Sequence, residues 1–189
     1  RGGKWARLGQ LSFLAHGAAV FTVIGCIFYA MLNQYYEYQY VSSHVSADLS
    51  QQYIFSAFWE GQEGSFLLWI FWHVVIGNIL VFTAKKWESS VMATLSLVQV
   101  FLTSMVLGIY IFEYKIGSNP FSTLLRNHPD FMLADIFNPS SSHFNLEYVK
   151  TIDGRGLNAL LQNYWMTIHP PTLFLGFAST VVPFCYAIA

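Results

Sequence analysis

Four long apolar stretches, each free of Lys, Arg, Asp and Glu, constrain this sequence more than any other feature. They run roughly over residues 8–32, 66–84, 91–112 and 172–189. A transmembrane helix needs about 20 predominantly apolar residues to cross a bilayer. The composition agrees, because charged residues make up only 10% of the chain, against about 25% in an ordinary soluble domain. We therefore expect an all-α integral membrane protein with about four transmembrane helices.

Cations near the ends of these stretches predict the orientation in the membrane. One group precedes the first stretch, and another lies between the second and the third. By the positive-inside rule, both groups face the cytoplasm. Two long loops, 33–65 and 113–171, then face the periplasm of a bacterium, or the matching space of an organelle if the gene is divided. The cations are Arg1, Lys4, Arg7, Lys85 and Lys86.

The start of the sequence and its two cysteines limit the other interpretations. The chain opens on Arg1 rather than Met, and its first apolar stretch is too long for a signal peptide. We expect residues 1–189 to form one membrane domain of a longer chain, or one product of a divided gene. Cys26 and Cys185 fall within predicted spans and form no C-x-x-C pair, so we predict no free metal site. A net charge of −1 gives no indication of nucleic-acid binding.

The segment FWEGQEGSFLLW, residues 58–69, connects the first outer loop to the second predicted span. Gly61 and Gly64 allow tight backbone turns. Ser65 is well placed to cap a helix that begins at Phe66. These features predict a turn that leads into a capped transmembrane helix.

Trp59, Glu60 and Glu63 of the same segment allow two interpretations. The two carboxylates precede a predicted helix N-terminus, where the helix dipole stabilises negative charge. In the structural interpretation they only strengthen the start of the helix. In the functional interpretation the tryptophan and the two acids are held at the outer surface, beside an incoming ligand.

The segment DGRGLNALLQNYWMTIHPPTLFLGF, residues 153–177, leads into the last predicted span. Gly154 and Gly156 interrupt the loop that precedes it. From Leu157 to Ile168, apolar side chains recur at spacings of three and four, which is typical of one apolar helix face. This periodicity predicts a short helix that lies along the membrane surface.

The two prolines predict where this surface helix ends and where the last span begins. Proline is tolerated in the first turn of a helix, so we expect Pro170 or Pro171 to begin the span. The residue before a proline is disfavoured in helical geometry. His169 is therefore expected at the joint between the two helices, at the outer boundary of the membrane.

His169 is the candidate ligand of this segment. The positive end of the helix dipole disfavours an imidazolium at that joint. A neutral imidazole at an apolar edge is suited to be an axial ligand of a haem iron. A lone histidine is more often a hydrogen-bonded structural residue, so the residues alone leave both interpretations open.

Four segments follow one another along the chain, separated by predicted spans: WEGQEGSFLLW, SNPF at 118–121, GRGLNALLQ and IHPPTLFLGF. In this order they resemble the N-terminal part of the CcmF family, which are cytochrome c-type biogenesis proteins grouped with CcmC and CcsA as haem-handling membrane proteins. The chain departs from the family at Leu157-Asn158-Ala159, where the family usually has Leu-Asn-Pro. Its loop 126–152 is also longer than in familiar members, and we assign it no role.

This resemblance implies a part in cytochrome c maturation, as a component of a haem lyase. The family takes haem b in transit from a chaperone, CcmE, and helps attach it to the C-x-x-C-H thiols of apocytochrome c, alongside CcmH-type thiol reductants. The histidine of its His-Pro-Pro element is one of two outward-facing axial ligands of that haem, and His169 occupies this position. The second outward histidine and the family's tryptophan-rich haem platform are absent from this sequence. The remaining part of a CcmF-like protein is therefore an expected partner, and we do not expect the chain alone to be an active lyase.

Chemistry, rather than the resemblance, suggests three further haem contacts. Trp59 and Trp165 are candidate apolar walls for the porphyrin, and Arg155 is a candidate partner of a propionate. Two alternatives from other classes remain. The chain could be a structural scaffold that docks partner chains without ligating haem, or a segment of a transporter for haem or another small molecule.

The other histidines and a run of tyrosines have less specific interpretations. His16 and His73 fall within predicted spans, where a histidine either contacts a cofactor or forms hydrogen bonds across helices. His44, His128 and His143 lie in outer loops, where we expect them to be solvated. Amphipathic aromatic rings favour the headgroup level of a bilayer. The tyrosines that follow the first span are therefore expected to form an interfacial belt, or a short extended segment; they are Tyr35, Tyr36, Tyr38 and Tyr40.

Overall fold

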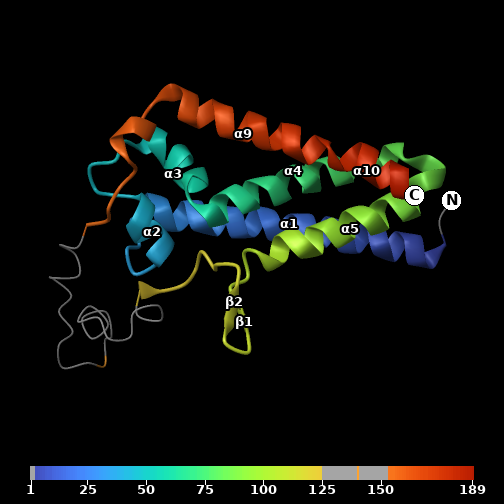
Figure 1. Ribbon diagram of the computed structural model, residues 1–189, viewed down its shortest axis with the longest axis horizontal. Coiled ribbons are helices and arrows are strands. Elements are labelled where there is room, and N and C mark those ends of the chain that lie inside the picture. Colours follow the sequence, from blue (N-terminus) through green and yellow to red (C-terminus); the bar gives the residue numbers. More distant parts are fainter. Residues whose placement is uncertain (1–2, 125–139, 141–152) are drawn as a thin grey trace.

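A bundle of helices, with shorter helices forming a cap at one end, makes up the fold (Figure 1). The structure is a computed structural model that describes residues 3–124, 140 and 153–189. The bundle helices are α1 (Lys4–Leu32), α4 (Gln62–Thr83), α5 (Glu88–Ser104), α9 (Tyr164–Ser179) and α10 (Val181–Ile188). The cap contains α2 (Gln39–His44), the 3₁₀ helix η1 (Gln51–Tyr53) and α3 (Ile54–Glu60). Two further 3₁₀ turns precede α5 and α9; they are η2 (Lys85–Trp87) and η3 (Ala159–Leu161).

Three helical stretches are long and apolar enough to cross a membrane: α1, α4 and Tyr164–Ile188, which α9 and α10 form together. They confirm the prediction of a mostly helical membrane protein. At 1.5 Å per residue, the 22 residues of α4 extend about 33 Å, which exceeds the hydrocarbon core of about 30 Å. The break at Thr180 between α9 and α10 has a local cause, because Pro183 has no N–H to donate to the Ser179 carbonyl oxygen.

The third predicted span, 91–112, is wrong at its C-terminal end. α5 has 17 residues and ends at Ser104. The chain then forms a hairpin in which β1 (Ile109–Ile111) pairs antiparallel with β2 (Tyr114–Ile116), so the description as all-α is also corrected. Gly108 has a φ of +61°, a left-handed conformation that no helix continues through. The β-branched and aromatic residues that follow it favour an extended backbone.

The predicted surface helix, Leu157–Ile168, is not formed either. Most of its first half lies in the η3 turn and in irregular backbone. The Asn163 side chain then accepts a hydrogen bond from the Met166 N–H at 3.1 Å and caps α9. From there α9 continues as one helix through Pro170 and Pro171. This cap could not be predicted from the residue type alone, because asparagine is equally common in loops.

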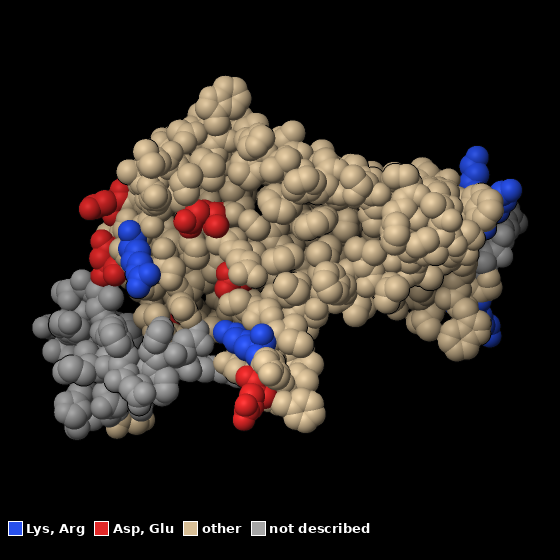
Figure 2. Space-filling model, viewed as in Figure 1, with Lys and Arg blue, Asp and Glu red and all other residues tan. Residues whose placement is uncertain are grey.

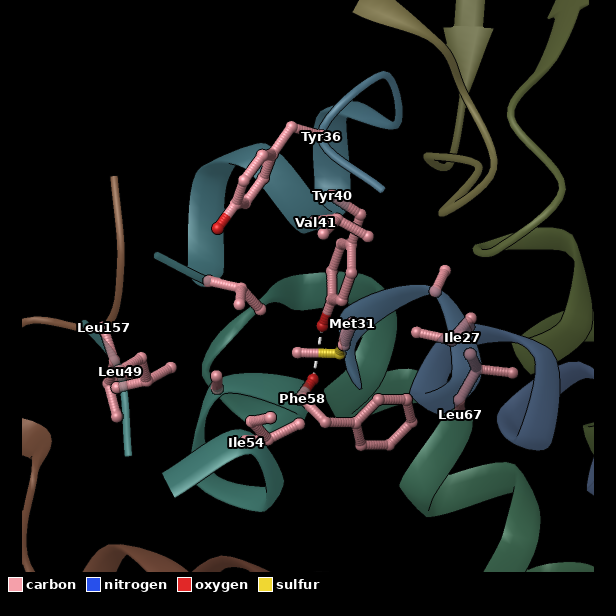
Figure 3. Packing of buried hydrophobic residues seen from close by; sticks show 13 residues of the cluster. Ile27, Met31, Tyr36, Tyr40, Val41, Leu49, Ile54, Phe58, Leu67 and Leu157 are labelled. Carbon is pink, nitrogen blue, oxygen red and sulfur yellow. Dashed lines mark hydrogen bonds between the residues drawn. The ribbon is translucent and has the colours of Figure 1, made fainter. Parts of the chain in front are cut away.

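One hydrophobic cluster joins the cap to the bundle (Figure 3). Met31 near the end of α1 and Leu67 of α4 are buried there together with Phe58 of α3. The Phe58 ring also stacks on Phe28 of α1, with the ring centroids 4.6 Å apart. Burying one such side chain stabilises a fold by about 1.5–3 kcal/mol, so the cluster holds the cap against the helix ends.

Charged side chains gather toward the two ends of the bundle, and the stretch between them shows none on the face in view (Figure 2). Phe82, Leu97 and Phe101 are all more than half exposed, as expected for side chains that face lipid or a further helix. The start of α1 lies beside the start of α5, because Gln10 donates a hydrogen bond to the Glu88 carboxylate at 2.6 Å. Four cations therefore share the end of the bundle opposite the cap; they are Lys4, Arg7, Lys85 and Lys86.

Candidate functional site at the capped end of the bundle

The turn between α3 and α4 is closed by the Tyr40 side chain of α2. Its hydroxyl donates a hydrogen bond to the Phe58 carbonyl oxygen and accepts one from the Gly64 N–H, 3.2 Å away. A Cβ at Gly64 would collide with the Phe58 carbonyl oxygen and with the Tyr40 hydroxyl. A Cβ at Gly61 would collide with the Tyr40 ring. The two glycines therefore permit the close approach of Tyr40, beyond the backbone freedom predicted from the sequence. Burial, reinforced by the nearby Glu63 carboxylate, raises the pKa of Tyr40, so its hydroxyl stays neutral and can donate.

Ser65 lies inside α4, which begins at Gln62 rather than at Phe66. The N-cap is Gly61, whose backbone is extended. The Ser65 hydroxyl donates instead to the Trp59 carbonyl oxygen at 2.7 Å. The predicted cap is therefore wrong. Ser65 supplies a hydrogen-bond donor to a carbonyl oxygen in the last turn of α3, and it does not cap the first turn of α4.

His44 connects α2 to the end of α3. Its Nδ1 lies 2.7 Å from the Tyr40 carbonyl oxygen, and its Nε2 lies 3.1 Å from a Glu60 carboxylate oxygen. The His44 side chain is only 16% exposed, so the prediction of a solvated histidine is wrong. Of the two acids in this segment, Glu63 alone lies in the first turn of α4, where the helix dipole favours it. The sequence analysis did not identify Tyr40 and His44 as a pair. Their spacing of four residues places both side chains on one face of α2.

The DGRG turn, residues 153–156, fastens the chain to the cap before α9 begins. The Asp153 carboxylate accepts hydrogen bonds from the N–H groups of Ala47 and Gly154, at 2.7 and 2.8 Å. These bonds lower the pKa of Asp153, with that from Ala47 contributing most. The Arg155 N–H donates to the Ser42 carbonyl oxygen at 2.8 Å, which leaves the Arg155 side chain exposed. The DGRG turn thus fastens the backbone to the cap, and the Arg155 side chain is exposed.

The residues that follow complete this attachment. Gly156 has a φ of +72°, which a residue with a side chain rarely adopts. Leu157 is buried in the cap cluster near Leu49 (Figure 3). The Asn158 side chain accepts a hydrogen bond from the Leu160 N–H at 3.0 Å and so begins η3. Each of these motif residues positions the backbone that enters α9.

The prolines lie in the second turn of α9, where three side chains from the cap and α4 hold the helix. Trp59 Nε1 donates to the Met166 carbonyl oxygen at 2.7 Å. Trp72 Nε1 donates to the Pro171 carbonyl oxygen at 3.0 Å. The hydroxyls of Ser56 and Thr167 lie 3.1 Å apart. These contacts place Trp59 against α9, although its ring is only partly buried.

His169 stands inside α9 and not at a joint between two helices, so that part of the prediction is wrong. Its side chain is exposed, and no hydrogen bond to it is formed by the part of the chain that the structure describes. Trp165, which is 71% exposed, precedes it by four residues and therefore lies on the same face of α9. His169, Trp165 and the Arg155 side chain are all exposed at the capped end of the bundle.

Two of the remaining histidines lie inside the bundle. His73 of α4 is 2% exposed, and His16 of α1 lines a groove beside α5. His73 lies against the Ala178 backbone of α9, without a hydrogen bond of regular geometry. Within residues 3–124 and 153–189, His16 Nε2 has no hydrogen-bond partner. His128 and His143, with nearly all of the loop 126–152, lie outside the described residues. Of the tyrosines expected at the interface, Tyr36 and Tyr40 are buried instead.

Comparison with known proteins decides the family. A family model described as "Cytochrome C assembly protein" matches residues 59–189. This range includes the turn before α4, the DGRG turn and residues 166–171 of α9, which we call the proline turn. The chain belongs to this family. The resemblance found in the sequence is therefore confirmed, and the matched region begins at the tryptophan that bonds to α9.

Several cytochrome c-type biogenesis proteins of this family are similar along most of the chain. CcmF of Pseudomonas aeruginosa is 30% identical over 97% of the chain, and CcmF of Escherichia coli is 29% identical over 79% of it. The probable biogenesis protein NrfE of Escherichia coli is 26% identical over 97% of the chain. The chain covers 23%, 19% and 28% of these relatives, respectively. No solved structure matches the chain.

Proposed function

We propose that this chain forms the first part of a membrane haem lyase component, which receives haem and helps attach it covalently to apocytochrome c. The observation that carries the proposal is the position of His169. It is exposed on α9, one helical turn from the exposed Trp165, at the end of the bundle that is held by the cap. A neutral imidazole is a good axial ligand for iron, and an indole offers a flat apolar surface to a porphyrin.

The residues around His169 suit a passing haem better than a resident one. The His169 side chain is exposed, so a haem bound there would remain open to exchange. Arg155 is exposed at the same end and can pair with a propionate. Since the chain covers 23% of CcmF of Pseudomonas aeruginosa, the second axial ligand and the second face of the haem belong to the remaining part of the protein in this proposal.

The proposed place of work is the outer side of a bacterial cytoplasmic membrane. The four cations opposite the cap would face the cytoplasm, and the cap with His169 would face the periplasm. Haem would arrive from a chaperone of the CcmE type, and the thiols of apocytochrome c would be kept reduced by a CcmH-type protein. The names of the relatives support cytochrome c biogenesis as the process.

The test replaces His169 by Ala in the native gene and stains c-type cytochromes for covalent haem. We expect loss of holocytochrome while a blot shows an unchanged amount of the protein in the membrane. Imidazole added to the medium should restore part of the staining, because it can enter the space left by the side chain and ligate the iron. Leu173→Ala is the matched control, since Leu173 is also exposed on α9 but cannot ligate a metal. Normal staining in the His169→Ala strain would overturn the proposal and favour a scaffold that only docks partner chains.

A further inference from the structure

The prolines beside His169 leave two backbone acceptors of α9 without their usual donors. In a regular helix the N–H of residue i donates to the carbonyl oxygen of residue i−4. Pro170 and Pro171 have no N–H, so the carbonyl oxygens of Met166 and Thr167 receive no such bond. A helix with this defect is free to bend or to rotate locally unless other groups bind it.

Two indole N–H groups bind the helix at this point. Trp59, in the last turn of α3, donates to the Met166 carbonyl oxygen at 2.7 Å, which is the acceptor that Pro170 leaves free. Trp72 of α4 donates to the Pro171 carbonyl oxygen at 3.0 Å. We call these two hydrogen bonds the indole clamp. Because Trp59 and Trp72 belong to consecutive helices, the clamp holds the proline turn from two separate elements.

The indole clamp brackets His169 along the helix. Met166 precedes His169 by three residues and Pro171 follows it by two, so one bond lies on each side of the imidazole. A rotation of α9 by a single residue position, about 100°, would turn the imidazole to a different face. Hydrogen bonds are directional and weaken steeply with misalignment, so two of them, one on each side of His169, oppose such a rotation.

The packing of α9 near His169 gives little other restraint. Tyr164 and Trp165 are about two-thirds exposed, and Ile168 is 40% exposed. Within α9 only Ala178, more than two turns beyond His169, is fully buried. Side chains of α9 are therefore fully buried only at its far end. Near His169 the side chains are at most partly buried, and hydrogen bonds from the cap and from α4 add to this packing.

From these relations we infer that Trp59 and Trp72 are positioning residues for His169. Their indole N–H groups fix the rotation of the proline turn so that the imidazole points outward to accept haem iron. This inference rests on the proposed haem ligation and assigns the tryptophan of the WEGQEG segment a role as donor to the α9 backbone, in place of an apolar wall for the porphyrin.

The experiment uses the complete gene and the protein purified from its own membrane with haem bound. Trp59→Phe keeps an aromatic ring but removes the N–H, and we expect it to retain about fivefold less haem, the effect of one lost hydrogen bond. The absorption spectrum of the remaining haem should shift toward five-coordinate iron, and imidazole added to the buffer should restore the six-coordinate spectrum. Trp72→Phe should act in the same direction.

Trp69→Phe is the matched control. Trp69 lies one turn from Trp72 on α4 and packs on Phe174 and Phe177, but its indole N–H has no partner among the described residues. Loss of that N–H should leave both haem retention and the spectrum unchanged. An equal loss in Trp69→Phe would show that the effect comes from altered ring packing, and would overturn the inference.

A double variant tests whether Trp59 positions His169 or only supplies a hydrogen-bond donor to the Met166 carbonyl oxygen. Pro170→Ala restores an N–H that can bond to the Met166 carbonyl oxygen, so Trp59→Phe/Pro170→Ala satisfies this acceptor without the indole N–H of α3. Pro171 and the contact between Ser56 and Thr167 are unchanged in this variant. We expect this double variant to regain thermal stability while its haem retention stays low. Recovery of haem retention together with stability would show that Trp59 only satisfies a carbonyl group, which would overturn the inference.

Failure of the inference can be told apart from failure of the proposed function. If His169→Ala abolishes holocytochrome but Trp59→Phe and Trp72→Phe keep the wild-type spectrum, haem ligation stands and the indole clamp has no positioning role. If His169→Ala leaves holocytochrome unchanged, haem ligation is wrong and the inference falls with it.

Discussion

Glu60 and His44 lie 3.1 Å apart, and their contact joins the two short helices of the cap, α2 and α3. The same imidazole reaches the Tyr40 carbonyl oxygen, 2.7 Å away, with its other nitrogen. Since Tyr40 also closes the turn before α4, one small network of side chains fixes the turn next to Trp59. Any change in this network should reach α9 through the indole clamp.

Glu60→Gln should lower the free energy of unfolding by about 0.5–1 kcal/mol, because the contact is partly exposed and such pairs contribute little. His44→Gln should have a similar effect. The loss in the double variant should be smaller than the sum of the two single losses, as expected for side chains that interact. Thermal unfolding in detergent micelles measures all three. Glu37→Gln is the control, because that carboxylate is exposed; strictly additive losses would contradict the pairing.

Gly64→Ala should destabilise the protein by about 1–3 kcal/mol or more, because its Cβ would collide with the Phe58 carbonyl oxygen and the Tyr40 hydroxyl. The unfolding temperature and the amount of folded protein in the membrane are the measurements. Gly25→Ala is the matched control, since a Cβ there meets no atom within 4 Å and alanine favours a helix. Equal behaviour of the two variants would show that the turn before α4 is packed differently.

Asp153→Asn should make the free energy of unfolding depend less on pH under acid conditions. The pKa of Asp153 is lower in the folded protein than its ordinary value of 3.8, so the carboxylate stabilises the fold above that value. This contribution is lost as the pH falls through the lower folded pKa. The group is mostly exposed, so solvent screening keeps the effect small. Urea midpoints between pH 2 and pH 6 measure it; identical profiles for wild type and variant would contradict the hydrogen bonds from Ala47 and Gly154.

The proposed orientation predicts which side of the membrane each end of the bundle faces. In a background with Cys26 and Cys185 replaced by serine, Asp48→Cys in the cap should react with a membrane-impermeant maleimide on intact cells. Lys86→Cys in η2 should react only after the membrane is opened. Both positions are exposed, so access to solvent does not differ between them. The reverse pattern would show that the cap faces the cytoplasm.

Several features of the site could be predicted from short segments. Gly61 and the DGRG turn mark positions where the backbone departs from regular structure, as their residue types predict. Gly64 and the two prolines lie inside α4 and α9, so the turn and the joint predicted there are wrong. What each glycine accommodates could not be predicted, because Tyr40 is 24 residues away from Gly64 and reaches it only through packing. The continuity of α9 through Pro170 was missed for the same reason, since its donor Trp59 lies 107 residues away from Met166.

The sequence by itself determined that this is a membrane protein, which end carries the cations and which family it belongs to. Each of those properties depends on residues that are close together in the sequence. About 20 apolar residues form a span, charges near its ends set the orientation, and short motifs in a fixed order identify the family. Only the tertiary structure decided that His169 lies inside a helix and that Trp59 and Trp72 hold that helix. Hydrogen bonds of this kind need a donor and an acceptor within about 3 Å, and only packing brings distant segments that close.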